Sequence, residues 1–279
     1  MSRVVAVAAL MLLAGCEDPL KVAQVLEEPR ILGVRLAGPD DRATLEPGQT
    51  AELEVLLAGP EGRVGARLAY RLCEAAASER GVPYCAAEPF AQATVDFDGT
   101  PLAVDVPAEL EPAVRLALLG IACLEGEPEL AADPLDWSCS GGDAGLRFSF
   151  DAESRATEVG NLNPDLSELS LSISGIALSA AAGSAACERG TAVLLAEATH
   201  DVRIALGERA REPQESLQLS HFSTDGRFER QYSFVAVEQP PEVTLTWRAP
   251  AAGTALQQYL VVRDGRGGTS WLGFNVCAD

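Results

Sequence analysis

The sequence predicts an all-β protein that contains two β-sandwich domains, at residues 30–152 and 164–279. Short runs in which apolar and polar residues alternate are typical of antiparallel strands with one buried face. Turn residues separate these runs, and about seven strands per half, at spacings of roughly 8–15 residues, are typical of a sandwich. The alternation lapses between Glu153 and Asn163, so we expect the domain boundary there.

The first residues have the layout of a secretory signal. Met1, Ser2 and Arg3 form a short basic start, and residues 4–14 follow without a charge. Eleven apolar residues in a helix span about 16 Å, which is roughly half of the ~30 Å hydrocarbon layer. Residues 1–15 are therefore predicted to be a signal peptide and not a membrane span.

The apolar segment ends in Leu13-Ala14-Gly15-Cys16, which resembles the lipobox of bacterial lipoproteins. The resemblance implies cleavage before Cys16, a diacylglycerol on its thiol and an acyl chain such as palmitate on its new amine. Two or more acyl chains anchor a protein stably to a membrane. An ordinary signal peptide that is cut near a free cysteine is the alternative.

The lipoprotein resemblance also implies a location in the cell envelope, on a membrane outside the cytoplasm. We expect the outer membrane in preference to the inner one. Glu17 and Asp18 keep the inner membrane open as an alternative, because acidic residues after the lipidated cysteine retain some bacterial lipoproteins there. Residues 16–29 are polar and read as a tether, which would reach about 40 Å if extended and about 20 Å if coiled.

The first half contains four clear alternating sets and one longer apolar run. Residues 113–123 form the longer run, which predicts a central strand, with a helix as the alternative. The turn signals are Gly38-Pro39, Pro47-Gly48, Gly59-Pro60 and Gly99-Thr100-Pro101. The alternating sets are Leu32-Val34-Leu36, Ala51-Leu53-Val55-Leu57, Leu68-Tyr70-Leu72 and Leu146-Phe148-Phe150.

The second half begins after Asn161-Leu162-Asn163-Pro164 and repeats the pattern. Residues 263–268 are rich in glycine and predict a hairpin turn between the last two strands. The predicted strands contain Leu169-Leu171-Ile173, Leu217-Leu219, Val243-Leu245-Trp247, residues 259–262 and Leu272-Phe274-Val276.

Three segments resemble bacterial immunoglobulin-like and PKD-like modules, which occur in many envelope lipoproteins of unknown function. Residues 29–35 and 47–53 look like the first two strands of such a module, and residues 264–268 look like its last hairpin. The resemblance implies an immunoglobulin-like sandwich and transfers no activity.

Six cysteines follow Cys16, an even number that predicts disulfides in an oxidising compartment. The domain layout favours Cys187 with Cys277, because this bond would tie the end of the chain into the second sandwich. For the first sandwich we expect Cys73 with Cys85 and Cys123 with Cys139, since each pair encloses a short polar segment. A cross-pairing such as Cys73 with Cys123 is the alternative.

The formal net charge of −20 argues against nucleic acid and anionic headgroups as partners, because both would be repelled, and simple solubility is the other interpretation of this acidity. The only histidines, His200 and His221, belong to no zinc motif, and the chain has no CxxC pair, GxSxG elbow or phosphate-binding loop. We therefore predict no metal, no cofactor and no catalytic residue. Two acidic loops, residues 96–99 and 133–136, lack the pattern of a calcium site and are interpreted as solvated turns.

The three tryptophans are assigned by their context. Trp247 alternates with core residues and is expected inside the sandwich. Trp271 lies out of phase with its neighbours, on the outer face or against the hairpin. Trp137 lies two residues before Cys139 and is expected to pack on a disulfide, with an exposed stacking platform as the alternative.

These features predict a membrane-anchored envelope lipoprotein that acts as a non-catalytic binding or scaffolding module. Its partner would be an envelope protein or a glycan. The alternative is an enzyme, or the carbohydrate-binding subunit of one, that acts on envelope or external polymers.

Replacing Cys16 by serine tests the anchor. The variant Cys16→Ser should lose its partitioning into the detergent phase in a Triton X-114 extraction, because the thiol that accepts the lipid is gone. A variant that still partitions with the detergent would contradict lipidation at Cys16.

Overall fold

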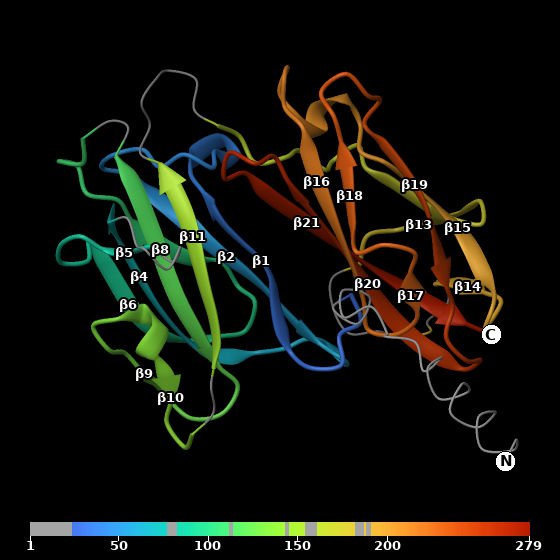
Figure 1. Ribbon diagram of the computed structural model, residues 1–279, viewed down its shortest axis with the longest axis horizontal. Coiled ribbons are helices and arrows are strands. Elements are labelled where there is room, and N and C mark those ends of the chain that lie inside the picture. Colours follow the sequence, from blue (N-terminus) through green and yellow to red (C-terminus); the bar gives the residue numbers. More distant parts are fainter. Residues whose placement is uncertain are drawn as a thin grey trace, which may run out of the picture.

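The computed structural model describes residues 24–76, 83–111, 114–142, 145–153, 161–181, 187 and 191–279. These residues form two immunoglobulin-like β-sandwiches, and the helical turns among them are short 3-10 segments at Pro39–Asp41, Pro134–Asp136 and Glu208–Ala210 (Figure 1). The predicted signal peptide, Cys16 and most of the expected boundary at residues 154–160 lie outside the described residues.

The first sandwich packs one sheet built around β2 against another built around β4 and β8. All of its strand pairs are antiparallel. The first sheet contains β1 (Arg30–Ala37), β2 (Thr50–Gly59), β3 (Gly62–Arg63) and β7 (Leu102–Asp105). The second contains β4 (Ala66–Ala76), β5 (Tyr84–Cys85), β6 (Ala91–Phe97), β8 (Arg115–Cys123) and β11 (Leu146–Glu153), and β9 (Pro128–Glu129) and β10 (Ser138–Cys139) form a separate ribbon.

The second sandwich packs two five-stranded sheets face to face. One sheet has the order β13 (Ile176–Leu178), β12 (Ser170–Ile173), β15 (Thr199–Ala205), β19 (Glu242–Arg248) and β17 (Arg227–Phe228). The other has the order β14 (Ala192–Leu194), β21 (Thr269–Ala278), β20 (Thr254–Arg263), β16 (Leu217–Ser223) and β18 (Tyr232–Val235), in which β14 runs parallel to β21.

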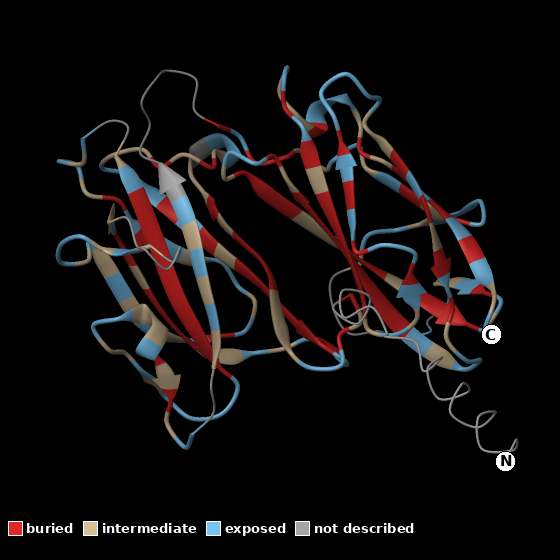
Figure 2. Ribbon diagram, in the orientation of Figure 1, coloured by how far each residue is buried: buried red, intermediate tan, exposed pale blue. Residues whose placement is uncertain are grey.

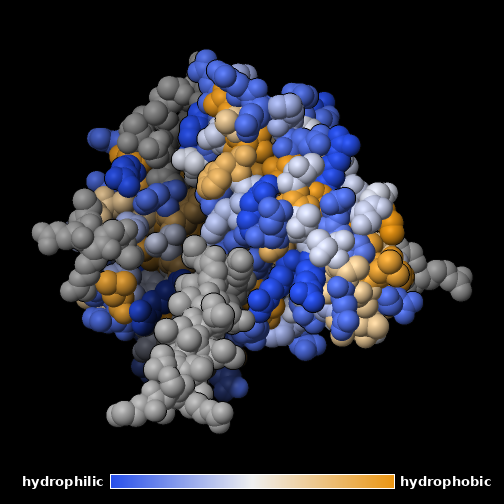
Figure 3. Space-filling model, turned by 45° about the vertical axis from the view of Figure 1, so that its right-hand side comes forward, coloured by the Kyte–Doolittle hydropathy of each residue, from blue (hydrophilic) through white to orange (hydrophobic). Residues whose placement is uncertain are grey.

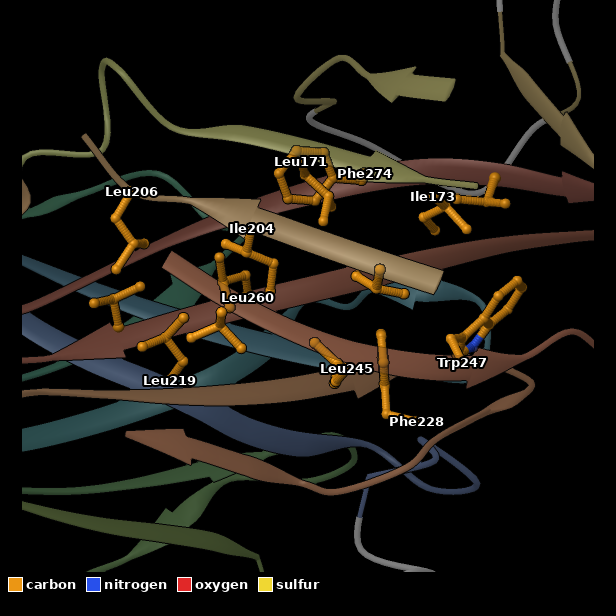
Figure 4. Close-up of a cluster of buried hydrophobic side chains, with 14 of the residues drawn as sticks. Leu171, Ile173, Ile204, Leu206, Leu219, Phe228, Leu245, Trp247, Leu260 and Phe274 are labelled. Carbon is orange, nitrogen blue, oxygen red and sulfur yellow. The ribbon is translucent and has the colours of Figure 1, made fainter. Parts of the chain in front are cut away.

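The alternation seen in the sequence places the two cores. Figure 2 shows buried residues running along the middle strands of each sandwich. The core of the second sandwich contains Leu171, Leu245 and Phe274, with Trp247 fully buried among them (Figure 4). The run at residues 113–123 is a central strand as expected, because β8 pairs with β4 on one side and β11 on the other.

The alternation fails at one point, and this corrects the prediction for Leu32. The register between β1 and β2 shifts between Ile31 and Gly33, so Leu32 is the extra residue of a β-bulge. Val34 contacts the core of the first sandwich, whereas Leu32 is buried in a different cluster. One inserted residue therefore turns an apolar side chain toward the neighbouring sandwich.

The two sandwiches pack side by side, so that four sheets lie in successive layers (Figure 1). The contact joins the outer face of β1 and β2 to the outer face of β16, β20 and β21. Its apolar residues, called the interface cluster below, are Leu26, Leu32, Leu56, Ala58, Phe222, Tyr259, Val261 and the half-buried Trp271.

Trp271 lies on the outer face of its sheet, which is one of the two positions expected from its phase. A Cβ atom added to Gly33 would lie 3.0 Å from the Trp271 ring, so the glycine allows the ring to approach the backbone of β1. The Arg35 guanidinium lies 5.3 Å from the ring centroid. A side chain at position 33 would require the ring to move by a few tenths of an ångström.

The segment before β1 is not a free tether over its described part, which corrects the expectation for residues 16–29. Leu26 and Gln24 are buried, and Leu26 belongs to the interface cluster. The Leu26 amide donates to the Ser223 carbonyl at 2.9 Å, and the Ser223 amide donates to the Gln24 carbonyl at 2.9 Å. The chain thus contacts the second sandwich before it enters the first.

Two asparagines between the sandwiches bond to both of them. The Asn163 side chain donates to the Asp41 carbonyl at 3.1 Å and accepts from the Thr269 amide at 3.0 Å. The Asn161 side chain donates to Asp264 at 2.8 Å, while the backbone carbonyl of Asn161 accepts from the Ala43 amide at 2.9 Å. Residues that the sequence marked as a boundary therefore cross-link the two domains.

Three disulfides join Cys73 to Cys85, Cys123 to Cys139 and Cys187 to Cys277, the pairs that the sequence favours. Their Cα atoms lie 5.4, 5.7 and 5.8 Å apart, within the usual range for a disulfide. Each bond stays within one sandwich. The bond from Cys187 closes the longest loop and is worth about 4–5 kcal/mol on the chain-entropy model.

Removing the Trp271 ring should weaken the whole molecule. We expect Trp271→Ala to lower the free energy of unfolding by about 3 kcal/mol, because the ring fills the contact between two sheets. The matched control is Phe234→Ala on the same sheet, whose side chain is 70% exposed, with a change within about 0.5 kcal/mol. Urea unfolding measures both, and equal losses would contradict the role given to Trp271.

Candidate functional site

Both histidines are held inside the second sandwich. The ring nitrogens of His200 bond the Leu195 carbonyl at 2.8 Å and the Ser174 hydroxyl at 3.0 Å. His221 bonds the Ser233 hydroxyl at 3.0 Å, and burial, with a smaller effect of the Arg230 charge, lowers its pKa from 6.5 to about 4. Both rings are therefore engaged in bonds that stabilise the domain.

The acidic loops are closed turns whose carboxylates bond to nearby groups. Asp98 accepts from the Thr100 amide at 2.9 Å, and hydrogen bonding by the Thr100 side chain, with that of the amide, lowers the pKa of Asp98. Asp96 pairs with Arg67 at 3.0 Å, and Asp133 accepts from the Leu135 amide at 2.9 Å. Within the described parts of the chain, no group of three His, Cys, Asp or Glu side chains is placed to hold a metal ion.

Trp137 packs beside a disulfide and offers no exposed platform. It is buried in a cluster with Cys123 and Cys139. Its indole Nε1 donates to the Ala131 carbonyl at 2.9 Å, and the Arg71 guanidinium lies 5.1 Å from the ring centroid. The packing interpretation of this tryptophan is confirmed.

The feature with the geometry of a binding site is a cleft of about 800 Å³ where the two sandwiches meet, which we call the junction cleft. Strands β1 and β11 of the first sandwich form two walls, and the turn between β20 and β21 forms a third. Apolar residues of the cleft include Ile31, Val34, Phe148 and Phe150, and three arginines, Arg115, Arg263 and Arg266, line it together with Asp151.

Asp264 shapes the wall that the second sandwich supplies. Its carboxylate accepts from the Arg266 amide at 2.7 Å and the Gly268 amide at 2.9 Å. Gly267, with a φ of 104°, adopts a conformation that side chains rarely permit. A Cβ atom on Gly268 would lie 2.6 Å from the Leu162 carbonyl oxygen, so the turn fits tightly against the connection between the domains.

The arginines of the junction cleft differ in how far their side chains are already bonded to the protein. Arg263 donates to the Leu32 carbonyl at 2.7 Å and the Ser220 hydroxyl at 3.1 Å, and burial lowers its pKa. Arg266 pairs with Glu212 and Glu215. Arg115 is 65% exposed and lies 3.5 Å from Asp151, a pairing that solvent screens. Arg263 thus supports the wall, and Arg115 remains accessible to a ligand.

Sequence reasoning did not predict the junction cleft. It identified residues 263–268 as a turn and Asn161 and Asn163 as a boundary, but the cleft exists only because β1, β11 and this turn meet. The disulfide cysteines and the histidines, which the sequence singled out, do not line it. No helix of the described residues is long and apolar enough to cross a membrane.

Comparisons with known proteins leave the family open. No protein-family model and no curated protein matches the chain. Among solved structures, elastase-activated Escherichia coli alpha-2-macroglobulin is similar at 11% identity and a TM-score of 0.27, over 90% of this chain and 20% of that one.

Two further structures are similar to a comparable degree. The chicken CNTN1 FN1–FN3 domains align at 8% identity and a TM-score of 0.24, over 89% of this chain and 66% of that one. Dimeric latent PorU from Porphyromonas gingivalis aligns at 11% identity and a TM-score of 0.26, over 95% of this chain and 21% of that one. Similarity this low says nothing about activity.

The buried His221 should make stability depend on pH. Because its pKa is lowered to about 4 in the folded protein, the unfolded chain binds a proton more readily between pH 6.5 and 4. Stability should fall as the pH drops through this window, by up to about 3 kcal/mol from this group. The variant His221→Gln should show a shallower loss in urea unfolding, whereas an unchanged slope would contradict the assignment.

Proposed function

We propose that the chain is an exported envelope lipoprotein, anchored through Cys16, whose joined sandwiches act as a non-catalytic binding module. The observation that carries this proposal is the junction cleft, which both sandwiches build and which the interface cluster holds in shape. Ligand sites favour such concave positions between domains.

Three features support export and anchoring. The lipobox at residues 13–16 gives the lipid site, and three disulfides suit an oxidising compartment. The face in Figure 3 shows mainly hydrophilic residues, with hydrophobic ones in separate patches, as suits a body exposed to water. We propose the outer membrane as its location.

The buried segment at Gln24 and Leu26 limits the distance between the lipid and the sandwiches. Gln24 is already buried, so at most eight residue steps separate Cys16 from the described part of the chain. Covalent geometry limits such a span to about 28 Å. The sandwiches would therefore be held closer to the membrane than a tether of residues 16–29 would allow.

A photo-crosslinking amino acid at Ser149 tests the binding role. Ser149 lines the junction cleft, and the full lipidated chain carrying the crosslinker there should give one discrete protein adduct in intact cells. The control places the crosslinker at Leu195, which is 73% exposed and does not line the cleft.

Two outcomes separate the proposal from its alternative. An adduct at position 149 that is absent at position 195 supports binding by the cleft. If no adduct forms and the purified protein degrades envelope polysaccharide, the enzyme alternative replaces the binding role.

A further inference from the structure

We propose that the junction cleft binds one extended polypeptide strand, which adds to the free edge of β11. The inference rests on the proposed binding function and names the ligand class for the same site. The strand would carry apolar side chains at alternate positions, facing into the cleft, and acidic side chains between them.

The register of the sheet shows which backbone groups of β11 are free. In β4, the Leu72 carbonyl accepts from the Phe90 amide and the Glu74 carbonyl from the Ala86 amide, both on the side of β5 and β6. Alternate residues of a strand direct their backbone groups to opposite sides. Arg71 and Cys73 therefore bond to β8.

The same alternation carries across β8 to β11. Arg71 pairs with Leu119 and Cys73 with Ala117, so Gly120 and Leu118 direct their backbone groups toward β11. Their partners are Phe148 and Phe150. Ser149 and Asp151 consequently direct their amides and carbonyls to the opposite side, where β11 lies near β1 but pairs with no strand among the described residues. The turn at Gly267 lies against the Asp151 carbonyl, so the open groups are the Ser149 amide and carbonyl and the Asp151 amide.

In β1, the wall opposite β11, backbone carbonyls are already bonded to groups from outside the first sandwich. The Leu32 carbonyl of β1 accepts from Arg263 at 2.7 Å, and the Leu36 carbonyl accepts from Asn163 at 3.3 Å. The backbone donors and acceptors that are left for an entering strand to pair with therefore lie on β11. A row of backbone groups is matched by another peptide backbone, which favours a polypeptide over a glycan or a lipid.

The apolar side chains between the walls define one face of the ligand. Ile31, Phe148 and Phe150 pack against the core of the first sandwich but are only partly buried. Phe148 lies over Gly120, where a Cβ atom would be 1.9 Å from the ring, so the aromatic ring fills a position that the neighbouring strand leaves open. Apolar side chains of an added strand would complete this burial at every second residue.

The charged residues of the cleft indicate which side chains lie on the other face of the ligand strand. Three arginines and one aspartate line it, in a chain with 21 basic and 41 acidic residues. Arg115 is the most accessible of the three, since Arg263 is bonded to β1 and Arg266 to glutamates. Carboxylates on the outward positions of the ligand would meet this charge and lead it to the cleft.

The test uses a phage-displayed library of random octapeptides, selected on the full chain in its soluble form Cys16→Ser without the signal peptide. Selected peptides should show apolar residues at alternate positions with Asp or Glu between them. In NMR hydrogen exchange, the bound peptide should slow the amides of Ser149 and Asp151.

Ser149→Pro is the matched variant, because proline removes an amide that faces the cleft and takes no bond from the ladder with β8. It should weaken peptide binding at least about tenfold. The control is Phe234→Pro on β18. The Gln231 carbonyl accepts from the backbone amide of His221 in β16, so odd-numbered residues of β18 bond to β16. The Phe234 amide therefore points to the opposite side, which is an unpaired edge outside the cleft.

Each result decides one question. Peptides that bind the wild type and Phe234→Pro alike but lose affinity for Ser149→Pro support the inference. Equal binding to all three proteins, or a library without binders, overturns it. If the adduct at position 149 still forms in cells, the binding function stands and only the ligand class is wrong.

Discussion

The packing of the Trp271 ring against the backbone of β1 at Gly33 joins the two sandwiches. It brings the outer faces of two sheets together, and the other members of the interface cluster fill the space around it. The Arg263 bond to the Leu32 carbonyl and the bonds of Asn161 and Asn163 cross the same interface. Together these contacts bring β1 and the turn at residues 264–268 to one place, where the turn forms the third wall of the junction cleft.

The interface also explains a feature of the strands that alternation alone leaves unexplained. Residues 55–58 of β2 and 259–262 of β20 are apolar without interruption. Val55 and Leu57 point into one core, whereas Leu56 and Ala58 point into the interface, so the sheet is buried on both faces. Continuous apolar runs are the expected pattern for such strands.

The segments that connect the two sandwiches also hold them in a fixed arrangement. Asn161 and Asn163 bond to both sandwiches, and the segment at Leu26 contacts the second sandwich before the chain builds the first. Domains joined by short polar linkers usually move relative to each other. Here the linker and the entry segment both cross the interface, which suits a cleft whose walls come from different domains.

Local patterns in the sequence were enough to predict the main strands, the turns between them and the favoured disulfide pairs. Alternation identifies a strand because each side chain points to a fixed face, and the disulfides of the first sandwich close short loops, such as that between Cys73 and Cys85. The bulge at Leu32, the burial of Leu26 and the junction cleft became visible only in the folded protein. These depend on contacts such as that between Arg263 and Leu32, which are 231 residues apart, and a local pattern carries no record of them.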